Sequence, residues 1–205
     1  MKAKATSPNT AKRPPRPRAA QTHEIRIIGG LWKRTKLKVA DKPGLRPTPD
    51  RVRETVFNWL GQDLSGLRCL DAFAGTGALG FEAASRGAQE VQLVEQDGAL
   101  VEQLKKTQAQ LQASAVHVVR GDGVSAIRQA APGSLDVIFI DPPFDAPLFE
   151  PALGACARAL ASEGWVYLES PTAYTDELLS AVGLSVHRHL KAGAVHAHLL
   201  KRSAA

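Results

Sequence analysis

Residues 71–80, Asp71-Ala-Phe-Ala-Gly75-Thr-Gly77-Ala-Leu-Gly80, join a short apolar run to a stretch with helical periodicity. The run over 68–73 predicts a buried β-strand, and the stretch over 78–86 predicts a helix. The alternation continues with strands predicted over 90–95, 116–120, 135–140 and 165–169 and helices over 98–113, 123–130 and 149–160. Strands that alternate with helices predict a doubly wound α/β sheet built from right-handed crossovers.

The end of the chain departs from this alternation. A helix is predicted over 176–182, followed by two strands over 184–190 and 194–201 that Lys191-Ala-Gly193 joins. So short a connection makes a hairpin, and at least one of these strands must therefore run antiparallel to its neighbours.

The glycine-rich turn admits two classes of cofactor. Gly75 to Gly80 matches the pattern G-x-G-x-x-G, and Glu95 lies twenty residues beyond Gly75, so the pattern alone permits a dinucleotide. Asp71 favours a different cofactor, because a carboxylate at the strand end repels a pyrophosphate and attracts a molecule that carries an ammonium and a sulfonium. S-adenosylmethionine fits that description.

Acidic residues also follow the next two strands. Glu95 ends the second strand and could accept both ribose hydroxyls, and Asp122 follows the third strand and could accept the adenine amino group. Open α/β sheets bind their ligands at this edge. The predicted cofactor contacts are Asp71, Phe73, Gly75, Gly77, Glu95, Asp122 and Gly123.

The fourth strand ends on Asp141-Pro142-Pro143-Phe144. Because prolines have no backbone N–H, this turn presents carbonyl oxygens and a carboxylate beside an aromatic face. Asp141 and the Pro142 carbonyl could each accept one N–H of an exocyclic amine and point its lone pair at a sulfonium methyl, while Phe144 stacks on the base. We take these four residues as the catalytic set of a direct methyl transfer that needs no metal.

Positive charge is concentrated at the N-terminal end. Residues 1–55 hold 15 Lys and Arg against 4 Asp and Glu, whereas the remaining residues hold 11 against 16. This asymmetry favours a polyanionic partner, nucleic acid ahead of a membrane surface. Residues 1–23 are basic, rich in proline and free of acids, which predicts a disordered arm, and the prolines disfavour an organellar transit peptide.

Residues 25–39 predict a β-hairpin that turns at Gly29-Gly30, since glycine supplies the positive φ angles of a two-residue turn. In its second strand, residues 32, 34, 36 and 38 share one face and form a basic strip with one aromatic ring. Such a strip either protects an edge strand or contacts phosphates. The candidate nucleic-acid contacts here are Trp32, Lys33, Arg34, Lys36 and Lys38.

Thr48-Pro49-Asp50 is typical of a helix start, with Thr48 as the N-cap. Apolar residues recur at helical spacing after it, so this helix should dock on the main domain; they are Val52, Val56, Trp59 and Leu60. Arg46, Arg51 and Arg53 lie near its start, where they could clamp phosphates or a cofactor carboxylate, or serve as surface solubilisers. Arg46 and Arg51 join the candidate nucleic-acid contacts.

Cysteine and histidine usage indicates no metal centre. Cys69 and Cys156 lie in apolar surroundings, which predicts buried free thiols in a reducing compartment. Four histidines form two H-x-H pairs, at 187 and 189 and at 196 and 198, for which solvated or RNA-facing side chains are favoured over a metal site. Because no apolar run reaches the roughly 20 residues that span a bilayer, we expect a soluble protein of the cytoplasm.

Five motifs together resemble the bacterial RsmD family: Ile25-Arg-Ile-Ile-Gly-Gly30, Gly44-Leu-Arg-Pro-Thr48, Arg51-Val-Arg-Glu-Thr-Val-Phe-Asn58, the stretch 71–80, and the turn 141–144. The resemblance runs from about residue 24 to the C-terminal hairpin. It implies a seven-stranded methyltransferase sheet whose final strand is inserted antiparallel, and methylation of the N2 amine of a guanine in 16S ribosomal RNA. It also implies a cofactor site at the glycine motif, Glu95 and Asp122, and RNA engagement by the N-terminal hairpin.

We therefore expect a basic arm over 1–23, an RNA-contacting extension over 24–62 and a methyltransferase domain over 63–205. The expected partner of this monomer is 16S ribosomal RNA in the small subunit or its assembly intermediate. Two alternatives remain. An enzyme of the same fold could act on adenine N6 or a protein glutamine, or the chain could be a non-catalytic RNA-binding assembly factor.

Overall fold

The computed structural model of this chain describes residues 24–38 and 48–203. The predictions for the arm over 1–23 and for Arg46 lie outside these residues. The strands are β1 (Glu24–Arg26), β2 (Lys36–Lys38), β3 (Arg68–Asp71), β4 (Glu90–Glu95), β5 (Val116–Arg120), β6 (Leu135–Ile140), β7 (Leu160–Ser170), β8 (Leu184–Ala192) and β9 (Val195–Arg202). The helices are α1 (Asp50–Trp59), α2 (Ala78–Ser85), α3 (Gly98–Leu111), α4 (Gly123–Gln129), α5 (Phe149–Ala159) and α6 (Asp176–Ser180).

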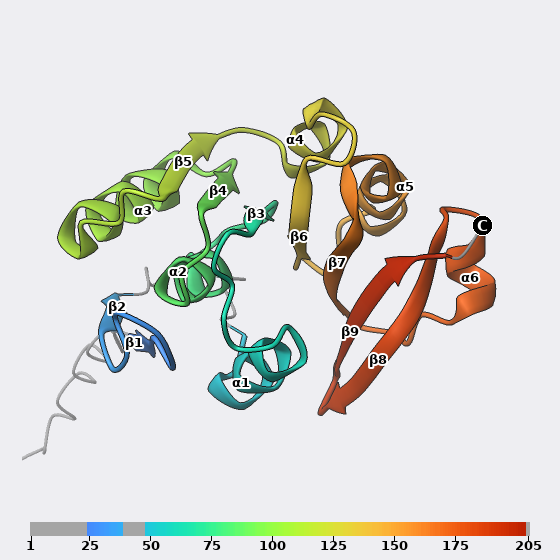
Figure 1. Cartoon of the computed structure of the whole chain (residues 1–205), viewed down its shortest axis with the longest axis horizontal. Coiled ribbons are helices and arrows are strands. Elements are labelled where there is room, and N and C mark those ends of the chain that lie inside the picture. The colour runs from blue at the N-terminus through green and yellow to red at the C-terminus, as the bar shows by residue number, and fades with distance from the viewer. Residues whose placement is uncertain (1–23, 39–47, 204–205) are drawn as a thin grey trace, which may run out of the picture.

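The main sheet has seven strands in the order β5-β4-β3-β6-β7-β9-β8 (Figure 1). Neighbours from β5 to β7 pair in parallel, whereas β9 pairs antiparallel with both β7 and β8. The predicted doubly wound sheet with an inserted antiparallel strand is therefore confirmed. The chain winds in opposite directions from β3, so the carboxyl ends of β3 and β6 border the crevice in which such sheets bind ligands.

Helices cover both faces of the sheet, with α1 and α2 on one side and α4 and α5 on the other (Figure 1). Strand β6 explains this arrangement, because alternate side chains of a strand point to opposite faces. Val137 and Phe139 pack into the cluster that contains the apolar residues of α1 and α2, and Ile138 and Ile140 pack into the cluster under α4 and α5. Phe57 of α1 meets Phe139 at a ring-centroid distance of 6.0 Å.

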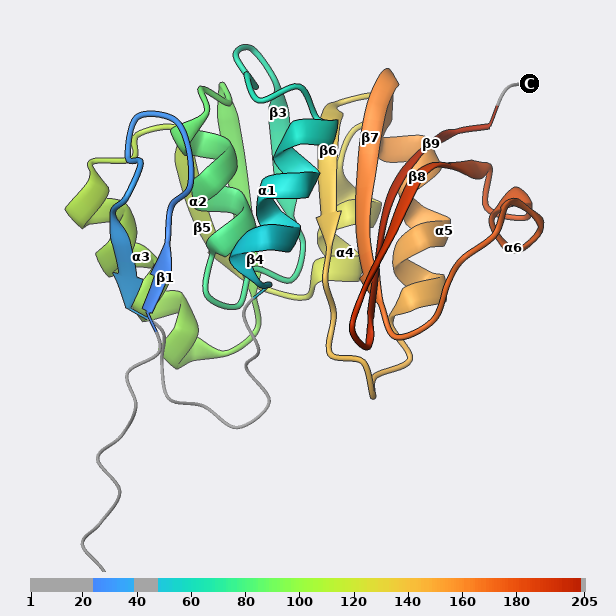
Figure 2. The same ribbon diagram turned by 90° about the horizontal axis from the view of Figure 1, so that it is seen from below.

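The N-terminal hairpin is present but does not turn at Gly29-Gly30 as predicted. Strands β1 and β2 pair Ile25 with Leu37, and a loop over 27–35 separates them. The loop docks on α2 instead of closing tightly: Leu31 N donates to the Ser85 carbonyl at 2.7 Å. In Figure 2 the whole hairpin lies on the side of α2 and α3, with its loop at one end and its two short strands at the other. The predicted basic strip is therefore not one face of a strand. Lys36 and Lys38 lie on β2, whereas Trp32, Lys33 and Arg34 lie in the loop.

Helix α1 differs from its prediction at two residues. Pro49 occupies the N-cap position and no side chain caps the helix, so the predicted Thr48 cap is wrong. Arg53 is fully buried, contrary to the expectation of a phosphate clamp or surface solubiliser. Its guanidinium pairs with Asp50 at 2.6 Å and with Glu82 of α2 at 3.4 Å. A buried arginine requires such partners, because desolvation of an unpaired charge is costly.

The β8–β9 hairpin buries one histidine that was expected to be exposed. His198 lies beneath Tyr174, whose backbone N–H donates to His198 Nε2 at 3.0 Å, and burial lowers its pKa to about 4. His189 stacks on both His196 and His198. A bulge between Val186 and Arg188 breaks the alternation of β8, and the His187 ring contacts Trp165. His187 and His189 therefore contact different rings and do not form the H-x-H pair that strand alternation predicted.

Candidate functional site

A cavity of about 620 Å³ opens at the carboxyl edge of the parallel strands. It is bordered by the glycine turn, by the ends of β4, β6 and β7, by the start of α1 and by the β8–β9 turn. Of the predicted residues, the cavity brings together Asp71, Phe73, Gly75, Glu95, Gly123, Asp141, Pro142, Pro143 and Phe144. Gly77 and Asp122 are not among its lining residues. This volume is typical of a small-molecule or cofactor site.

The glycine turn connects the sheet to the cavity through backbone donors. Gly75 and Gly77 have φ angles of 51° and 77°, which residues with a side chain rarely adopt. Gly75 N donates to Glu95 Oε2 at 2.9 Å, and Gly80 N donates to Asp71 Oδ2 at 3.0 Å. A Cβ at Gly80 would come within 2.0 Å of Leu93 Cδ2, so this glycine is required for packing of α2 on β4.

Asp71 is the most buried acid of the predicted cofactor set, with 2% of its surface exposed. Burial raises its pKa to about 7, and the nearby Glu95 charge adds to the rise, while the Gly80 and Phe73 amides act in the opposite direction. A cation brought next to Asp71 would restore the carboxylate. This acid is therefore suited to a positively charged ligand.

Glu95 and Asp122 are both held by hydrogen bonds. Glu95 Oε1 accepts from Asp97 N at 2.8 Å, and Glu95 keeps lone pairs for a diol. Asp122 caps α4 by accepting from Ser125 N at 2.7 Å and also accepts from Gln96 Nε2 at 2.9 Å. The hydrogen bonds from Ser125, and to a smaller extent the one from Gln96, lower the pKa of Asp122. Its capping role explains why Gly121 and Gly123, rather than Asp122 itself, line the cavity.

The Asp-Pro-Pro-Phe turn forms the opposite wall of the cavity. Asp141 is partly exposed, Pro142 is buried, and Phe144 leaves 39% of its surface exposed. The Phe144 ring lies 6.3 Å from the Phe149 ring at the start of α5, centroid to centroid. An exposed, supported ring beside carbonyl and carboxylate acceptors fits a planar substrate that carries an amine.

Two residues of this wall were not predicted. Glu169, at the end of β7, lines the cavity and accepts from the Tyr167 hydroxyl at 2.7 Å. Thr48 also lines the cavity, and its hydroxyl donates to Asp141 Oδ2 at 3.4 Å. Glu169 could have been found, because it follows the same rule of an acid at a strand end; Thr48 carried no such signal.

Acids from four strand ends, Asp71, Glu95, Asp141 and Glu169, therefore face one cavity. Burial raises the Asp141 pKa well above its usual range, and the charges of Glu169 and Asp71 raise it further, whereas the Thr48 hydrogen bond lowers it. Carboxylates this close together disfavour simultaneous ionisation unless a cation joins them. A ligand that carries positive charge would satisfy that requirement, and Asp71, Glu95 and the glycine turn line the part of the cavity that could receive it.

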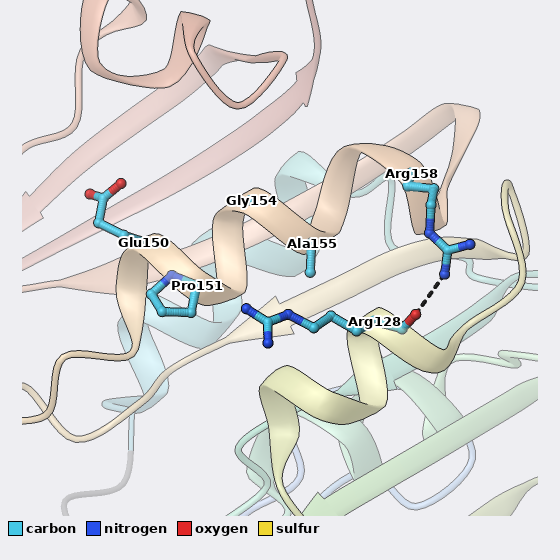
Figure 3. Close-up of a pocket in the computed structure, with 6 residues that line it drawn as sticks. All are labelled: Arg128, Glu150, Pro151, Gly154, Ala155 and Arg158. Carbon is cyan, nitrogen blue, oxygen red and sulfur yellow. Dashed lines mark hydrogen bonds between the residues drawn. The ribbon is translucent and has the colours of Figure 1, made fainter.

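A second, smaller cavity of about 380 Å³ lies between α4 and α5 (Figure 3). Arg128, Glu150 and Arg158 line it together with Pro151, Gly154 and Ala155. Arg158 is committed to the structure, since it donates to the carbonyls of Arg128 and Ala130 at 2.6 and 2.7 Å. This cavity shares no lining residue with the main cavity at the carboxyl edge.

Comparison with known proteins identifies the family. The chain is 42% identical over 191 residues to "Ribosomal RNA small subunit methyltransferase D" of Escherichia coli (strain K12), covering 92% of this chain and 96% of that protein. The family model described as conserved hypothetical protein 95 matches residues 25–201. The chain belongs to the RsmD family.

Other relatives agree with this assignment. An RsmD-family protein of Haemophilus influenzae with the same name is 45% identical over 152 residues, covering 72% of this chain and 79% of that protein. The solved structure titled "Putative methyltransferase yhhF from Escherichia coli" has a TM-score of 0.74 at 42% identity and covers 89% of this chain and all of that one. The RsmD relatives thus match both the sequence and the fold.

Two further properties concern residues 24–38 and 48–203 alone. No helix within these ranges is both long enough and apolar enough to cross a membrane. Nor do the described side chains contain a group of three or more His, Cys, Asp or Glu arranged to hold a metal ion. Both cysteines are buried and free, as predicted.

Proposed function

We propose that this chain transfers a methyl group from S-adenosylmethionine to the exocyclic N2 amine of a guanine in 16S ribosomal RNA. The observation that carries the proposal is that Asp71, Glu95 and the Asp141-Pro142-Pro143-Phe144 turn line the same cavity. The names of the RsmD relatives, which are methyltransferases of small-subunit ribosomal RNA, support the RNA class. The choice of guanine N2 follows the family resemblance.

The cofactor-binding half of the site has defined roles. Asp71 balances the positive charge of the amino-acid portion, Glu95 accepts the ribose hydroxyls, and the glycine turn lets the backbone approach closely. Asp122 keeps Gly121 and Gly123 in place at the end of the cavity by capping α4. When bound, S-adenosylmethionine supplies an electrophilic methyl group on a sulfonium.

The substrate-binding half positions the amine. Asp141 and the Pro142 carbonyl each accept one N–H, which favours pyramidalisation and orients the nitrogen lone pair toward the methyl carbon. Phe144 stacks on the base once it has left its helix or loop. An N-methylated amine that leaves the reaction still protonated can give its proton to Asp141 or to water, so deprotonation need not precede transfer.

The basic N-terminal extension supports RNA as the partner. Lys33, Arg34, Lys36, Lys38 and Arg51 are all exposed, and Trp32 is half-buried beside them. We extend the proposal to a monomer that acts in the cytoplasm on the small subunit or on its assembly intermediate. Phosphate contacts by these side chains would hold the RNA, while the turn at 141–144 selects the reacting amine.

The decisive experiment uses purified protein, S-adenosylmethionine with a labelled methyl group, and undermethylated small subunits or their extracted RNA. Nuclease digestion and nucleoside mass analysis should recover the label as N2-methylguanosine. Label in N6-methyladenosine or in protein glutamine would overturn the substrate assignment. Cofactor binding without any turnover on either substrate would instead indicate a non-catalytic assembly factor.

A further inference from the structure

The Thr48 hydroxyl lies at the junction between the N-terminal extension and the catalytic turn. Only 5% of the Thr48 surface is exposed, and the residue lines the main cavity. Its side chain does not cap α1, because Pro49 stands at the N-cap position. Instead Thr48 Oγ1 donates to Asp141 Oδ2 at 3.4 Å, across 93 positions of sequence. The hydroxyl therefore serves the cavity rather than the helix.

A buried arginine holds Thr48 in this place. Arg53 Nε donates to the Thr48 carbonyl at 3.3 Å, and Arg53 Nη2 donates to the Arg26 carbonyl of β1 at 2.9 Å. Arg53 Nη1 in turn reaches Glu82 of α2, at 3.4 Å. Both charged side chains are fully buried, so neither can move away without losing its partner.

The same network reaches the hairpin. Glu82 accepts from the backbone N–H groups of Ile28 and Gly29, each at 2.8 Å. Hydrogen bonds thus run without a break from the hairpin loop through Glu82 and Arg53 to Thr48, and from Thr48 to Asp141.

We propose that Thr48 is a positioning residue for methyl transfer: its hydroxyl occupies Asp141 Oδ2, leaves Oδ1 for the substrate amine, and ties the catalytic turn to the RNA-contacting extension. The effect on rate rests on the proposed function. The hydrogen bond itself does not, and it can be tested in the free protein.

The surroundings of Asp141 explain why such a donor is needed. The ionisable groups near it are Glu169 and Asp71, with Asp145 on the same turn and the Tyr167 hydroxyl bonded to Glu169. Of these groups, the charges of Glu169 and Asp71 disfavour a charge on Asp141. Thr48 acts in the opposite direction, since donation by its hydroxyl lowers the pKa of Asp141.

The test compares Thr48→Val, which keeps the shape and loses the donor, with Thr48→Ser, which keeps the donor. Thr55→Val is the matched control, because the Thr55 hydroxyl bonds to the Arg51 carbonyl on the exposed side of α1. The first readout is the carboxyl titration of Asp141 by carbon NMR in the free protein, assigned with Asp141→Asn. The second is kcat and KM on undermethylated small subunits.

Thr48→Val should raise the Asp141 pKa and lower kcat about tenfold, the value of one hydrogen bond to a charged group. Thr48→Ser and Thr55→Val should stay within about twofold of the wild type, with the cofactor Kd unchanged in all three variants. An Asp141 titration that Thr48→Val does not change would overturn the proposal. So would a Thr48→Ser protein as impaired as Thr48→Val, or a rise in KM for RNA at constant kcat. If the wild-type protein transfers no methyl group, the proposed function fails, and the titration still decides the role of Thr48.

Discussion

The acids of the cavity lie where their own charge is unfavourable. Asp71 and Asp141 follow different strands; burial raises the pKa of each, and the charge of a neighbouring carboxylate raises it further. Such groups bind protons in the free protein and release them when a cation arrives. At the residue scale, the cavity is therefore suited to a ligand that carries positive charge.

Asp141→Ala should abolish methyl transfer and leave cofactor affinity within about threefold of the wild type, because the side chain faces the proposed amine rather than the glycine turn. A loss of at least about 100-fold in kcat is expected from removing one preorganised acceptor. Labelled methyl transfer and calorimetric titration with the cofactor measure the two quantities. Glu163→Ala, an exposed acid of β7 that does not line the cavity, is the control. A parallel loss of cofactor binding would show that Asp141 has been misassigned.

Asp71 should make the stability of the free protein depend on pH. Its pKa is about 7 when folded, against 3.8 for an ordinary aspartate, so its contribution is fully present below about pH 4 and is lost as the pH rises through about 7. Asp71→Asn should therefore flatten the fall in Tm over this range and exceed the wild-type Tm at about pH 8, by at least about 2 °C. Differential scanning fluorimetry checks it.

The control for Asp71 is Asp63→Asn. Hydrogen bonds from Ser65 lower the Asp63 pKa, so this variant removes a group with the opposite dependence. It should leave the Tm falling over the same pH range as in the wild type. An Asp71→Asn protein whose Tm falls as steeply as that of the wild type would contradict the prediction.

At the scale of elements, two glycines two residues apart behave differently where β3 meets α4. A Cβ on Gly123 would lie 2.0 Å from the Ala72 carbonyl oxygen, whereas a Cβ on Gly121 has nothing nearer than Val94 Cγ1 at 3.8 Å. Both residues line the cavity. The backbones of β3 and α4 can approach only because residue 123 has no side chain.

Gly123→Ala should destabilise the protein by about 1–3 kcal/mol, the usual range for overpacking, and weaken cofactor binding. Gly121→Ala should change both by less than about 0.5 kcal/mol. Urea denaturation and calorimetry provide the measurements. Equal effects of the two substitutions would mean that the close approach at Ala72 does not limit this site.

The hairpin strip should act mainly through charge. Replacing Lys33, Arg34, Lys36 and Lys38 with alanine should weaken RNA binding and lower the slope of log K against log salt by up to about 3, roughly 0.7 for each lost phosphate contact. Lys36 also pairs with Glu24 at 2.6 Å, so its own share should be smaller. Filter binding over a salt series measures the slope.

The control for the strip removes four other exposed positive charges, Lys105, Lys106, Lys201 and Arg202. This control variant loses the same net charge as the strip variant. If the strip binds RNA directly, the control should therefore change the salt slope less than the strip variant does. If the two variants weaken binding alike, or if neither does, the strip only protects an edge strand.

At the scale of the whole molecule, the extension and the sheet share one hydrophobic core. Ile25, Leu37 and Phe57 belong to the same cluster as Phe81 and Phe139. We retain the division into an RNA-contacting extension over 24–62 and a methyltransferase domain over 63–205 as a functional proposal. Physically, the buried Glu82 network and this cluster join the two parts, so RNA held by the extension would be fixed relative to the cavity.

Glu82→Ala should cost about 3–5 kcal/mol of unfolding free energy, because it removes the only fully buried carboxylate that pairs with the buried guanidinium of Arg53 among the described residues and leaves the exposed Asp50 as its remaining acidic partner. Arg86, bonded to Glu82 at 2.9 Å, is affected in the same way. Amide exchange at Ile28 and Gly29 should also accelerate. Glu54→Ala, on the exposed side of α1, is the control. A loss below about 1 kcal/mol in chemical denaturation would argue against the network.

Much of the fold followed from local pattern. Apolar runs of strand length and helical spacing located each element of the parallel sheet, and the acids at their ends marked the cavity edge. Predictions failed where a local signal had a distant competitor. The Gly29-Gly30 turn opened because its loop bonds to Ser85, and Thr48 left the helix cap because Asp141 lies beside it. Arg53 resembled a surface charge until Glu82 supplied its partner.

The sequence by itself determined the alternation of strands and helices in the parallel sheet, and that Asp71, Glu95 and Asp141 lie at the ends of three of its strands. These features depend on periods of two and 3.6 residues, which are readable over a few positions. Only the tertiary structure decided that Glu169 joins the acids, that Glu82 holds the hairpin, and that Thr48 meets Asp141. Such contacts join residues far apart in the chain, and packing of the whole core, rather than any local preference, brings them together.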